Sequence, residues 1–460
     1  MVNFKRIQYT VFTTTANIFF VMNPSAAPPL AHLVQADRVH RDAYISSAVF
    51  EQEQRRFFAA TWNFVAHGSQ IPLAGDYITM DLAGRPLLVV RQADGTISVF
   101  YNRCAHKGTK LYTNASGNAG KVLQCAYHAW SYRLDGRTLG IPLRQEYTGS
   151  KMAQCETGQG LTHVGAVAVH RDFVFVRLDA QGVDFAAYFG DALQWLDNMA
   201  DRSPSGRLMV AGGVIRNVIR CNWKMYLENI NDTVHPVSTH ESAGRAAKAV
   251  WEQQPQEEMP MSIEQMLPFA SGYDFFSRLD AEVYPHGHSA LAVNFSTHTG
   301  YAYPQDYLDA LVQAHGEERA RQVLGKAPQN SVLYPSIAVK GAPLVMRVVR
   351  PLAVDRMLLE AWSFRAEGAP DLLHERALSY NRLVFSPMSI VAHDDIHLFE
   401  GVQQGLQAQG NEWVSLHRGH NGDSGDSQVT GPTPCKGTSE LLMRNQFQAW
   451  AKFMAEPEEI

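Results

Sequence analysis

Short runs with alternating apolar and polar residues fill the first third of the chain. The runs are rich in β-branched and aromatic residues and are separated by turn signals such as Asp94-Gly95 and Asp135-Gly136. The expected strands are 62–65, 76–82, 87–91, 97–101, 122–124, 130–134, 166–169 and 173–177. This pattern predicts a small all-β domain over residues 62–180. An arm and an amphipathic helix at 48–60 precede it and make up residues 1–61.

The periodicity changes after residue 180. Residues 181–205 are expected to form a mixed linker, and Asp394 is expected to follow a late helical stretch. The expected strands are 207–219, 291–297, 338–339, 346–351 and 358–365, and the expected helices are 223–231 and 374–384. Strands and helices do not alternate as regular βαβ units, so the second domain, 181–460, should be an antiparallel sheet covered by helices. The fold class is therefore α+β.

Composition sets outer limits on the kind of protein. The 460 residues are 45% apolar and 18% charged, with a net charge of -5, which is typical of a globular protein of two or more domains. No basic stretch with interleaved aromatic residues occurs, so a nucleic-acid partner is not expected.

Four Cys and His residues at close spacing indicate an iron-sulfur cluster. Cys104, His106, Cys125 and His128 form Cys-x-His, eighteen residues, then Cys-x-x-His. A zinc finger would keep two Cys in one half and two His in the other, whereas one of each per loop suits a cluster with two unlike irons. The pattern predicts a Rieske 2Fe-2S centre. A zinc knuckle or scattered structural residues are the alternatives.

Residues around these ligands fit the cluster hypothesis. Gly108 and Gly117 would allow the backbone close to sulfide, and Tyr127 and Trp130 could shield the cluster from water. The pattern resembles the Rieske proteins of respiratory and photosynthetic complexes, but those carry an additional Cys in each loop, joined as a disulfide. Thr109 and Tyr127 occupy those positions here, which favours a lower-potential centre that feeds an oxygenase.

The remaining cysteines and the N-terminus indicate a reducing cytoplasm. Cys155, Cys221 and Cys435 are an odd number, which argues against a disulfide framework. The apolar stretch Tyr9–Met22 is interrupted by polar residues and is too short to span a bilayer, so neither a signal peptide nor a membrane anchor is expected. Met22 is the expected start of the chain.

A second metal site is indicated by Asp232-x-x-His235-x-x-x-x-His240. Two imidazoles and a carboxylate make the facial triad that holds mononuclear Fe(II) and leaves coordination positions open. The five-residue spacing turns about 500° on a helix, so the helix should break between the histidines, and Pro236 offers a cause. Taken alone, such a group is usually structural, and the cluster motif upstream is what favours iron.

The two motifs, their order and the chain length resemble the α subunits of Rieske non-haem iron ring-hydroxylating oxygenases, over about residues 40–420. The segment Ser386–Glu400 resembles the benzoate-type version of the carboxylate segment. The resemblance implies that Asp395 completes the triad, with Asp394 as the alternative, unless these residues cap the helix that follows.

The resemblance also implies an electron bridge between subunits. Asp232 should contact His235 and accept the N–H of His128 from a neighbouring copy of the chain, which requires a homotrimer or an α3β3 assembly. Asn229 should lie near the iron. A capping or surface role for Asp232 is the alternative.

The implied activity is cis-dihydroxylation of an aromatic substrate with dioxygen. Electrons from NAD(P)H would arrive through a separate reductase, with or without a ferredoxin. The sequence leaves open whether a small β subunit accompanies the chain. An aromatic acid is the favoured substrate; Arg347 or Arg350 could pair its carboxylate, although strand arginines are more often structural. A Rieske monooxygenase would use the same residues, and an electron carrier would require the triad to be a coincidence. His286-Gly287-His288 is expected to be a loop and not a third metal site.

Overall fold

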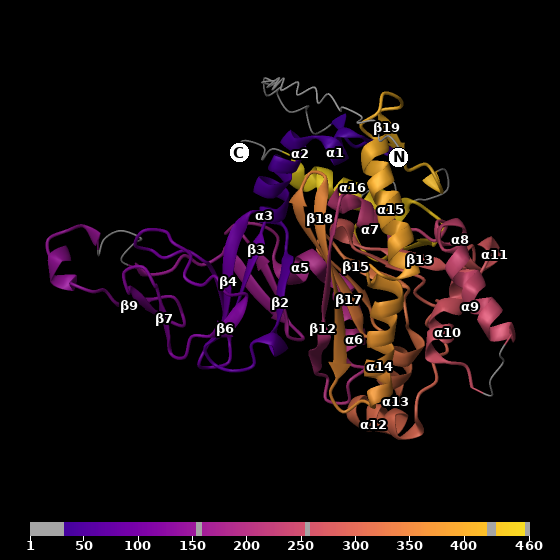
Figure 1. The fold of residues 1–460 in the computed structure, drawn as a ribbon, viewed down its shortest axis with the longest axis horizontal. Coiled ribbons are helices and arrows are strands. Elements are labelled where there is room, and N and C mark those ends of the chain that lie inside the picture. The colour runs from indigo at the N-terminus through magenta and orange to yellow at the C-terminus, as the bar shows by residue number, and fades with distance from the viewer. Residues whose placement is uncertain (1–31, 153–158, 254–257, 421–428, 456–460) are drawn as a thin grey trace, which may run out of the picture.

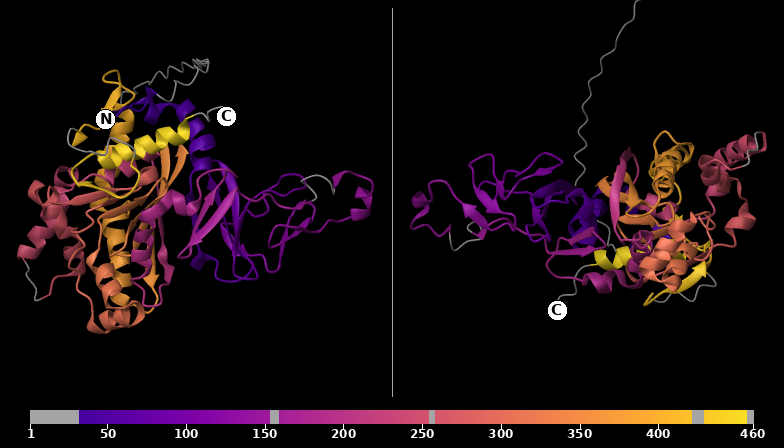
Figure 2. Two further views of the ribbon diagram at one scale, coloured as in Figure 1. Left: turned by 180° about the vertical axis from the view of Figure 1, so that it is seen from behind. Right: turned by 90° about the horizontal axis from the view of Figure 1, so that it is seen from below.

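The computed structural model describes residues 32–152, 159–253, 258–420 and 429–455, which form two lobes (Figure 1). A narrow lobe of short strands projects away from a broad lobe built on one large sheet, and the views from behind and from below agree (Figure 2). The expected start at Met22, the stretch Tyr9–Met22 and Cys155 lie outside the described residues. The α+β fold class is confirmed.

Three small antiparallel sheets build the narrow lobe. Their strand orders are β10-β11-β2, β5-β4-β3-β6 and β7-β8-β9. The strands are β2 (Asn63–His67), β3 (Asp76–Leu82), β4 (Arg85–Arg91), β5 (Ile97–Tyr101), β6 (Ser116–Asn118), β7 (Val122–Gln124), β8 (Ser131–Arg133), β9 (Thr138–Gly140), β10 (Ala166–His170) and β11 (Phe173–Arg177). Every strand expected in this region is present, and β6 and β9 are additional.

Strand alternation gives this lobe two hydrophobic cores. In β4, Leu87 and Val89 face one core, while Leu88 and Val90 face the other. The second core also contains Cys104, Cys125 and Trp130. The central sheet therefore fixes the cluster loops through the side chains of its second face.

One antiparallel sheet of eight strands forms the broad lobe, in the order β12-β18-β17-β16-β15-β14-β13-β20. Its strands are β12 (Leu208–Ile219), β13 (Asp280–Val283), β14 (Ser289–Leu291), β15 (Asn330–Leu333), β16 (Ile337–Lys340), β17 (Val345–Ala353), β18 (Arg356–Ala366) and β20 (Thr433–Lys436). A separate pair joins β1 (Arg38–His40) to β19 (Trp413–Ser415). The antiparallel sheet expected here is confirmed.

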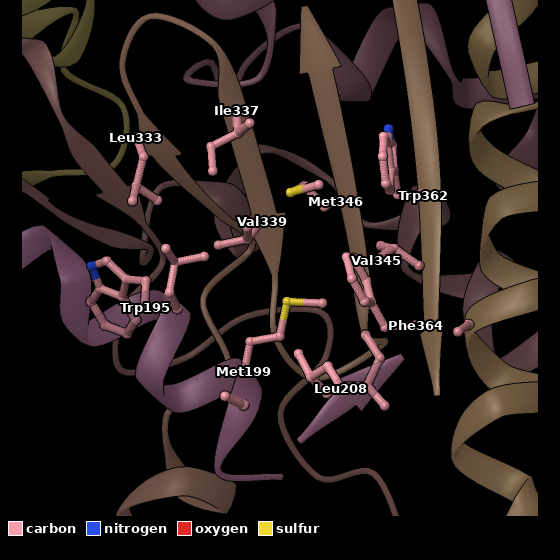
Figure 3. Packing of buried hydrophobic residues seen from close by; sticks show 14 of the residues in the cluster. Trp195, Met199, Leu208, Leu333, Ile337, Val339, Val345, Met346, Trp362 and Phe364 are labelled. Atoms are coloured by element: carbon pink, nitrogen blue, oxygen red, sulfur yellow. The ribbon is translucent and has the colours of Figure 1, made fainter. Parts of the chain in front are cut away.

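Helices cover this sheet. The elements are α1 (Asp42–Ile45), α2 (Ser47–Gln52), a π-helical turn (Glu53–Phe57), α3 (Phe58–Ala60), α5 (Phe185–Phe189), α6 (Gln194–Ala200), α7 (Trp223–Asn229), α8 (Pro236–Thr239), α9 (Glu241–Gln253), α10 (Met261–Met266), α11 (Tyr273–Phe276), α12 (Gln305–His315), α13 (Glu317–Gly325), α14 (Asp371–Tyr380), a π-helical turn (Asn381–Phe385), α15 (Ile390–Gly405) and α16 (Leu441–Met454). Helices α14 and α15 lie along the sheet (Figure 1), and α14 contacts β18. Trp195 and Met199 of α6 pack on buried side chains such as Val339 and Val345 (Figure 3). No helix in the described ranges is both long and apolar enough to cross a membrane.

Three of the expected elements differ from the structure. Residues 181–205 are not a linker, because α5 and α6 fold there and bury Trp195 and Leu196 in the main core. The strand expected at 291–297 ends at Leu291, since Ala292 has a positive φ of 58° that a regular strand does not tolerate.

The helix expected at 48–60 is interrupted by the π-helical turn at 53–57. This turn holds the buried Glu53, whose carboxylate accepts hydrogen bonds from the Lys224 ammonium at 2.5 Å and from the Trp223 and Trp450 indoles at 3.0 and 2.8 Å. These contacts tie the helix to α7 and α16, and a buried carboxylate needs such partners.

Candidate functional site

The structure brings the four candidate cluster ligands together at the projecting end of the narrow lobe. Cys104 and His106 follow β5, and Cys125 and His128 lie on the turn between β7 and β8. Both thiols are 2% exposed, and the two imidazole rings have centroids 4.6 Å apart. Burial raises the pKa of the Cys104 thiol, and the neighbouring Cys125 adds to the rise. A metal that binds thiolate would replace these protons.

The two ligand turns share one backbone arrangement. The carbonyl of Cys104 accepts a hydrogen bond of 3.0 Å from Gly108, and the carbonyl of Cys125 accepts one of 3.0 Å from Ala129. Gly108 and Ala129 both have positive φ, at 78° and 54°. Each turn therefore bends back four residues after its Cys, and only Gly108 makes that bend without a side-chain penalty.

Aromatic side chains flank the imidazoles unequally. Trp130 is buried and stacks on His106 at 4.8 Å, as expected for a side chain that shields the cluster position. Tyr127 lies over His128, with ring centroids 3.8 Å apart, and is itself 66% exposed. Gly117 lies in β6 against a tyrosine ring, and its expected role in a cluster loop is wrong.

The chemistry of these groups fits a Rieske cluster. The Nδ1 atom of His106 is buried and has no hydrogen-bond partner among the described residues, as expected for a nitrogen that binds metal. Desolvation, His128 and Lys107 lower the pKa of His106, which favours the neutral imidazole that acts as a ligand. The Tyr132 hydroxyl lies 3.1 Å from the sulfur of Cys104, where it can donate to a thiolate.

The three candidate iron ligands converge from two distant parts of the chain. His235 and His240 flank the short helix α8, and Asp395 lies in α15. The Oδ1 atom of Asp395 is 3.3 Å from Nε2 of His240 and 3.9 Å from Nε2 of His235. One ligand atom from each residue lies within 4.8 Å of the others, a grouping that no other His, Cys, Asp and Glu set in the described ranges matches. The expected helix break between the histidines is confirmed, with Pro236 as the first residue of α8.

Asp394 and Asp395 occupy different environments. Asp394 lies 3.5 Å from Nδ1 of His240, on the side of the ring away from Asp395. Burial alone would lower the pKa of His240, but Asp395 and Asp394 outweigh it and raise that pKa. Ser389 caps α15 by accepting from the Ala392 N–H at 3.1 Å, so the alternative that these aspartates cap the helix is wrong.

Asp232 is held by several partners in the loop before α8. Its Oδ1 atom accepts from the backbone N–H groups of Val234 and His235 at 2.6 and 2.7 Å and lies 3.3 Å from Nδ1 of His235. Its Oδ2 atom accepts from the guanidinium of Arg418. Burial alone would raise the pKa of Asp232, but the His235 hydrogen bonds and the Arg418 charge hold it well below its usual range. Asp232 is thus an ionised partner of His235.

Asn229 and Arg418 complete the surroundings of these ligands. Asn229 donates from Nδ2 to Oδ1 of Asp395 at 3.2 Å, which places it beside the candidate iron ligands. Arg418 was not identified from the sequence, because it lies 186 residues after Asp232 in a loop without a motif.

The cluster loops and the candidate iron ligands are far apart within one chain. Strand β7, which leads into the turn with Cys125 and His128, lies in the projecting lobe at one end of the molecule, and α8 and α9 lie towards the other end (Figure 1). The view from below shows the same separation (Figure 2). Electron transfer slows steeply with distance, so this arrangement disfavours direct transfer within one copy.

A pocket opens beside the candidate iron ligands. It encloses about 710 Å³ of space, part of it open to solvent. Its walls contain His235, His240 and Asp395 together with apolar and aromatic side chains. These include Pro268, Phe269, Phe276, Leu291, Tyr380, Val384, Phe385 and Val391.

Other residues considered for ligand binding have different roles. Arg350 is directed to Glu360 at 2.9 Å, and Arg347 donates to Asn330 and to the Tyr226 hydroxyl. The strand arginines are therefore engaged with protein groups.

A short 3-10 turn covers Pro285–Gly287 and ends before His288, as expected for a loop. His288 is buried and uses both ring nitrogens, since Nε2 contacts the Tyr188 carbonyl and Nδ1 accepts from the Tyr334 N–H, each at 2.9 Å. It has no nitrogen left for a metal.

Comparison with known proteins gives matches over nearly the whole chain. Residues 61–156 match the Rieske 2Fe-2S domain family, and residues 196–456, more than half of the chain, match the ring hydroxylating alpha subunit catalytic domain. The large subunit of anthranilate 1,2-dioxygenase from Acinetobacter baylyi is 28% identical, covering 91% of this chain and 89% of that one. The N,N-dimethyl phenylurea N-demethylase subunit alpha from Sphingobium is 27% identical, covering 88% of each.

Solved structures share the fold. Naphthalene 1,2-dioxygenase with indole in its active site superposes with a TM-score of 0.74 at 22% identity, covering 92% of this chain and 94% of that one. The chain belongs to the ring-hydroxylating oxygenase α subunits, whose cofactors are a Rieske 2Fe-2S cluster and a mononuclear iron.

Proposed function

We propose that this chain is the terminal oxygenase component that cis-dihydroxylates an aromatic acid with dioxygen. Electrons from NAD(P)H would reach it through a separate reductase, with or without a ferredoxin. The observation that carries the proposal is the convergence of His235, His240 and Asp395 on the wall of an apolar pocket. Two imidazoles and one carboxylate leave positions open for reactants, unlike a closed structural site.

Seven residues would hold the cofactors. Cys104, Cys125, His106 and His128 would bind the 2Fe-2S cluster, and His235, His240 and Asp395 would bind Fe(II). When bound, the cluster supplies single electrons and the mononuclear iron supplies the activation of dioxygen.

Neighbouring side chains orient the iron ligands. Asp232 accepts from the His235 ring, which fixes that imidazole so that Nε2 points towards Asp395. The Oδ2 atom of Asp394 lies 3.5 Å from Nδ1 of His240 as an ion pair without a formed hydrogen bond, while Asn229 donates to one oxygen of Asp395. Such outer partners set ring orientation and increase the basicity of an imidazole ligand.

The pocket walls would position the ring of the substrate. Phe269, Phe385 and Val391 line the space beside the ligands, and such side chains exclude water from the reacting atoms. An apolar wall of this kind holds a planar ring by burying its surface, without committing hydrogen bonds to it.

The proposed assembly is a trimer, with or without a small β subunit, in the cytoplasm. The separation of the two sites within one chain supports it, because an electron would more readily cross from His128 of a neighbouring copy to His235 through Asp232. The Oδ2 atom of Asp232 accepts one hydrogen bond within its own chain, from Arg418, and a carboxylate oxygen has about two acceptor positions, so Oδ2 can accept a further N–H. The term large subunit in the name of the anthranilate relative supports a smaller partner.

A monooxygenase that hydroxylates once or removes an alkyl group is the second candidate. The relative named as an N-demethylase subunit favours it, since it matches the chain about as well as the anthranilate relative does. Labelled dioxygen separates the two activities. With a supplied reductase and aromatic acids as substrates, we expect a cis-diol carrying two labelled atoms; a product with one labelled atom would establish the monooxygenase instead.

A further inference from the structure

Three neighbouring strands of the large sheet have a terminal residue on the same side of the sheet, and these three residues line the pocket. Leu291 ends β14, Asn330 begins β15 and Lys340 ends β16, and all three line the pocket. Leu291 pairs with Asn330 in the sheet register, and Lys340 pairs with Val345 at the start of β17. The candidate iron ligands flank α8 or lie in α15. The ends of these three strands therefore form a separate wall of the same pocket.

Lys340 places an ammonium group in this wall without an acidic partner. Lys340 is only 4% exposed. Its hydrogen-bonding contact is Nε2 of His298 at 3.4 Å, and no carboxylate pairs with it in the described part of the chain. Buried charges in proteins are ordinarily paired, because removing them from water is costly.

The surroundings of Lys340 are strongly positive. Burial and nearby cations lower the pKa of His298 well below its usual value, so this histidine is neutral. The cations around it are Lys340, Arg347, Arg202 and Arg376. Arg376 has a carboxylate nearby, Glu264 at 3.7 Å, whereas the Nη1 atom of Arg347 is buried without a partner in the described residues.

The acidic groups of the pocket cannot supply the missing charge. Asp232 is paired with Arg418, and Asp395 faces the two histidines. Burial and Arg347 lower the pKa of Lys340, and an anion beside its ammonium would offset both effects. A ligand is therefore the natural counter-ion of this wall.

We propose that Lys340 binds the carboxylate of the aromatic substrate and makes the pocket selective for aromatic acids. This inference deepens the proposed function and rests on it, because it takes the pocket beside His235, His240 and Asp395 as the substrate site. The ring would lie against Phe269, Phe385 and the other apolar walls. A carboxylate is the fitting group, since it accepts charge-assisted hydrogen bonds from an ammonium.

The test compares aromatic acids with their own carboxamides. Benzoate, 2-aminobenzoate and 2-naphthoate are titrated into the iron-loaded protein by calorimetry, each beside its neutral amide. We expect at least one acid to bind about 10-fold to 100-fold more tightly than its amide, as for other charge-assisted contacts. Equal binding of every acid and its amide would overturn the proposal, and this comparison requires no mutation.

Variants then assign the preference to one side chain. K340M should remove the acid preference and leave amide binding within about 2-fold, K340R should restore part of it, and K326M is the matched control. Lys326 is suitable because it lies over the Trp195 ring and does not line the pocket. An acid preference that survives in K340M would mean that another group, such as the iron, binds the carboxylate.

The two proposals fail in distinguishable ways. If the oxygenase proposal is wrong, an acid preference can persist in binding while labelled dioxygen gives no oxygenated product. If the Lys340 proposal is wrong, oxygenation proceeds while acids and amides bind alike. Iron content and thermal unfolding of K340M should match the unmutated protein, which excludes a folding defect as the cause of weaker binding.

Discussion

The candidate cluster site and the candidate iron site differ in how far their proposed ligands are exposed to solvent. In the candidate cluster site the two thiols are buried, but His128 is exposed in the projecting lobe. In the iron site His240 is 1% exposed, and the ligands line a pocket with apolar walls. The outer site can meet a partner protein or a second copy of the chain, whereas the inner site is accessible to small molecules.

This difference divides the two demands of an oxygenase between two lobes. Electrons are proposed to enter from another protein, which could approach the exposed imidazole of His128. The oxygen chemistry requires water to be kept away from the reacting atoms, which requires burial. Asp232 would connect the two sites. It contacts the imidazole of His235, a candidate iron ligand, and is proposed to contact the imidazole of His128 from a neighbouring copy of the chain.

The largest expected effect comes from breaking the link between the two sites. D232A should lower steady-state turnover by about 100-fold or more while both metal centres stay occupied, since the path between them is lost and the ligands are not. Asp197→Ala is the matched control, because Asp197 also pairs with a histidine, His170 at 2.9 Å, but lies outside both sites. Normal turnover in D232A would refute the bridge.

A smaller effect sharpens the description of the outer site. Y132F removes the hydroxyl 3.1 Å from Cys104, and losing a hydrogen bond to a thiolate destabilises the reduced, more negative cluster. The cluster potential should become more negative by on the order of 50 mV, about one tenfold change in a one-electron equilibrium. Redox titration followed by electron paramagnetic resonance measures it, with Tyr112→Phe as control because Tyr112 stacks on Tyr77 instead. A potential that stays the same or rises would contradict this role.

The smallest effect concerns the stability of the broad lobe. Burial lowers the pKa of His288 to about 3, and its hydrogen bond to the Tyr188 carbonyl opposes this effect. Its ordinary pKa is about 6.5, so the unfolded chain takes up a proton below that pH and the folded chain does not. Stability contributed by His288 is therefore present above pH 6.5 and lost as the pH falls towards 3.

Urea unfolding at pH 7.5, 6.5 and 5.5 measures this loss. Below pH 6.5 one such group changes the unfolding free energy by up to about 1.4 kcal/mol per pH unit. The unfolding free energy of His288→Asn should fall less steeply with decreasing pH than that of the unmutated protein. Part of the pH dependence should remain, because burial also lowers the pKa of His67 to about 3. Identical slopes in both proteins would rule out His288 as the source.

The same contrast between the lobes explains what the sequence could predict. The candidate cluster ligands lie between residues 104 and 128, in loops that follow strands with a clear alternating pattern, so local patterns predicted the strands and local spacing was enough to propose the ligand set. The iron ligands are separated by the stretch from His240 to Asp395, and only the resemblance to a family connected them. No local sequence pattern predicts that α15, and not α14, carries the carboxylate that lies beside the histidines that flank α8.

Tertiary contacts decided the remaining differences. The segment at 181–205 has weak local signals, and its helices form because Trp195 and Leu196 pack into the main core. Lys340 and Arg418 carry no motif, since their importance comes from what lies beside them in space. Arg347 was considered from the sequence for carboxylate binding, but Asn330 and Tyr226 already occupy part of its guanidinium.

Counting iron tests the central claim that His235, His240 and Asp395 hold a metal separate from the cluster. The unmutated protein should contain about three irons per chain, two in the cluster and one in the second site. D395A should fall to about two irons per chain while the electron paramagnetic resonance signal of the reduced cluster stays unchanged. Two irons in the unmutated protein, or three retained in D395A, would contradict the account.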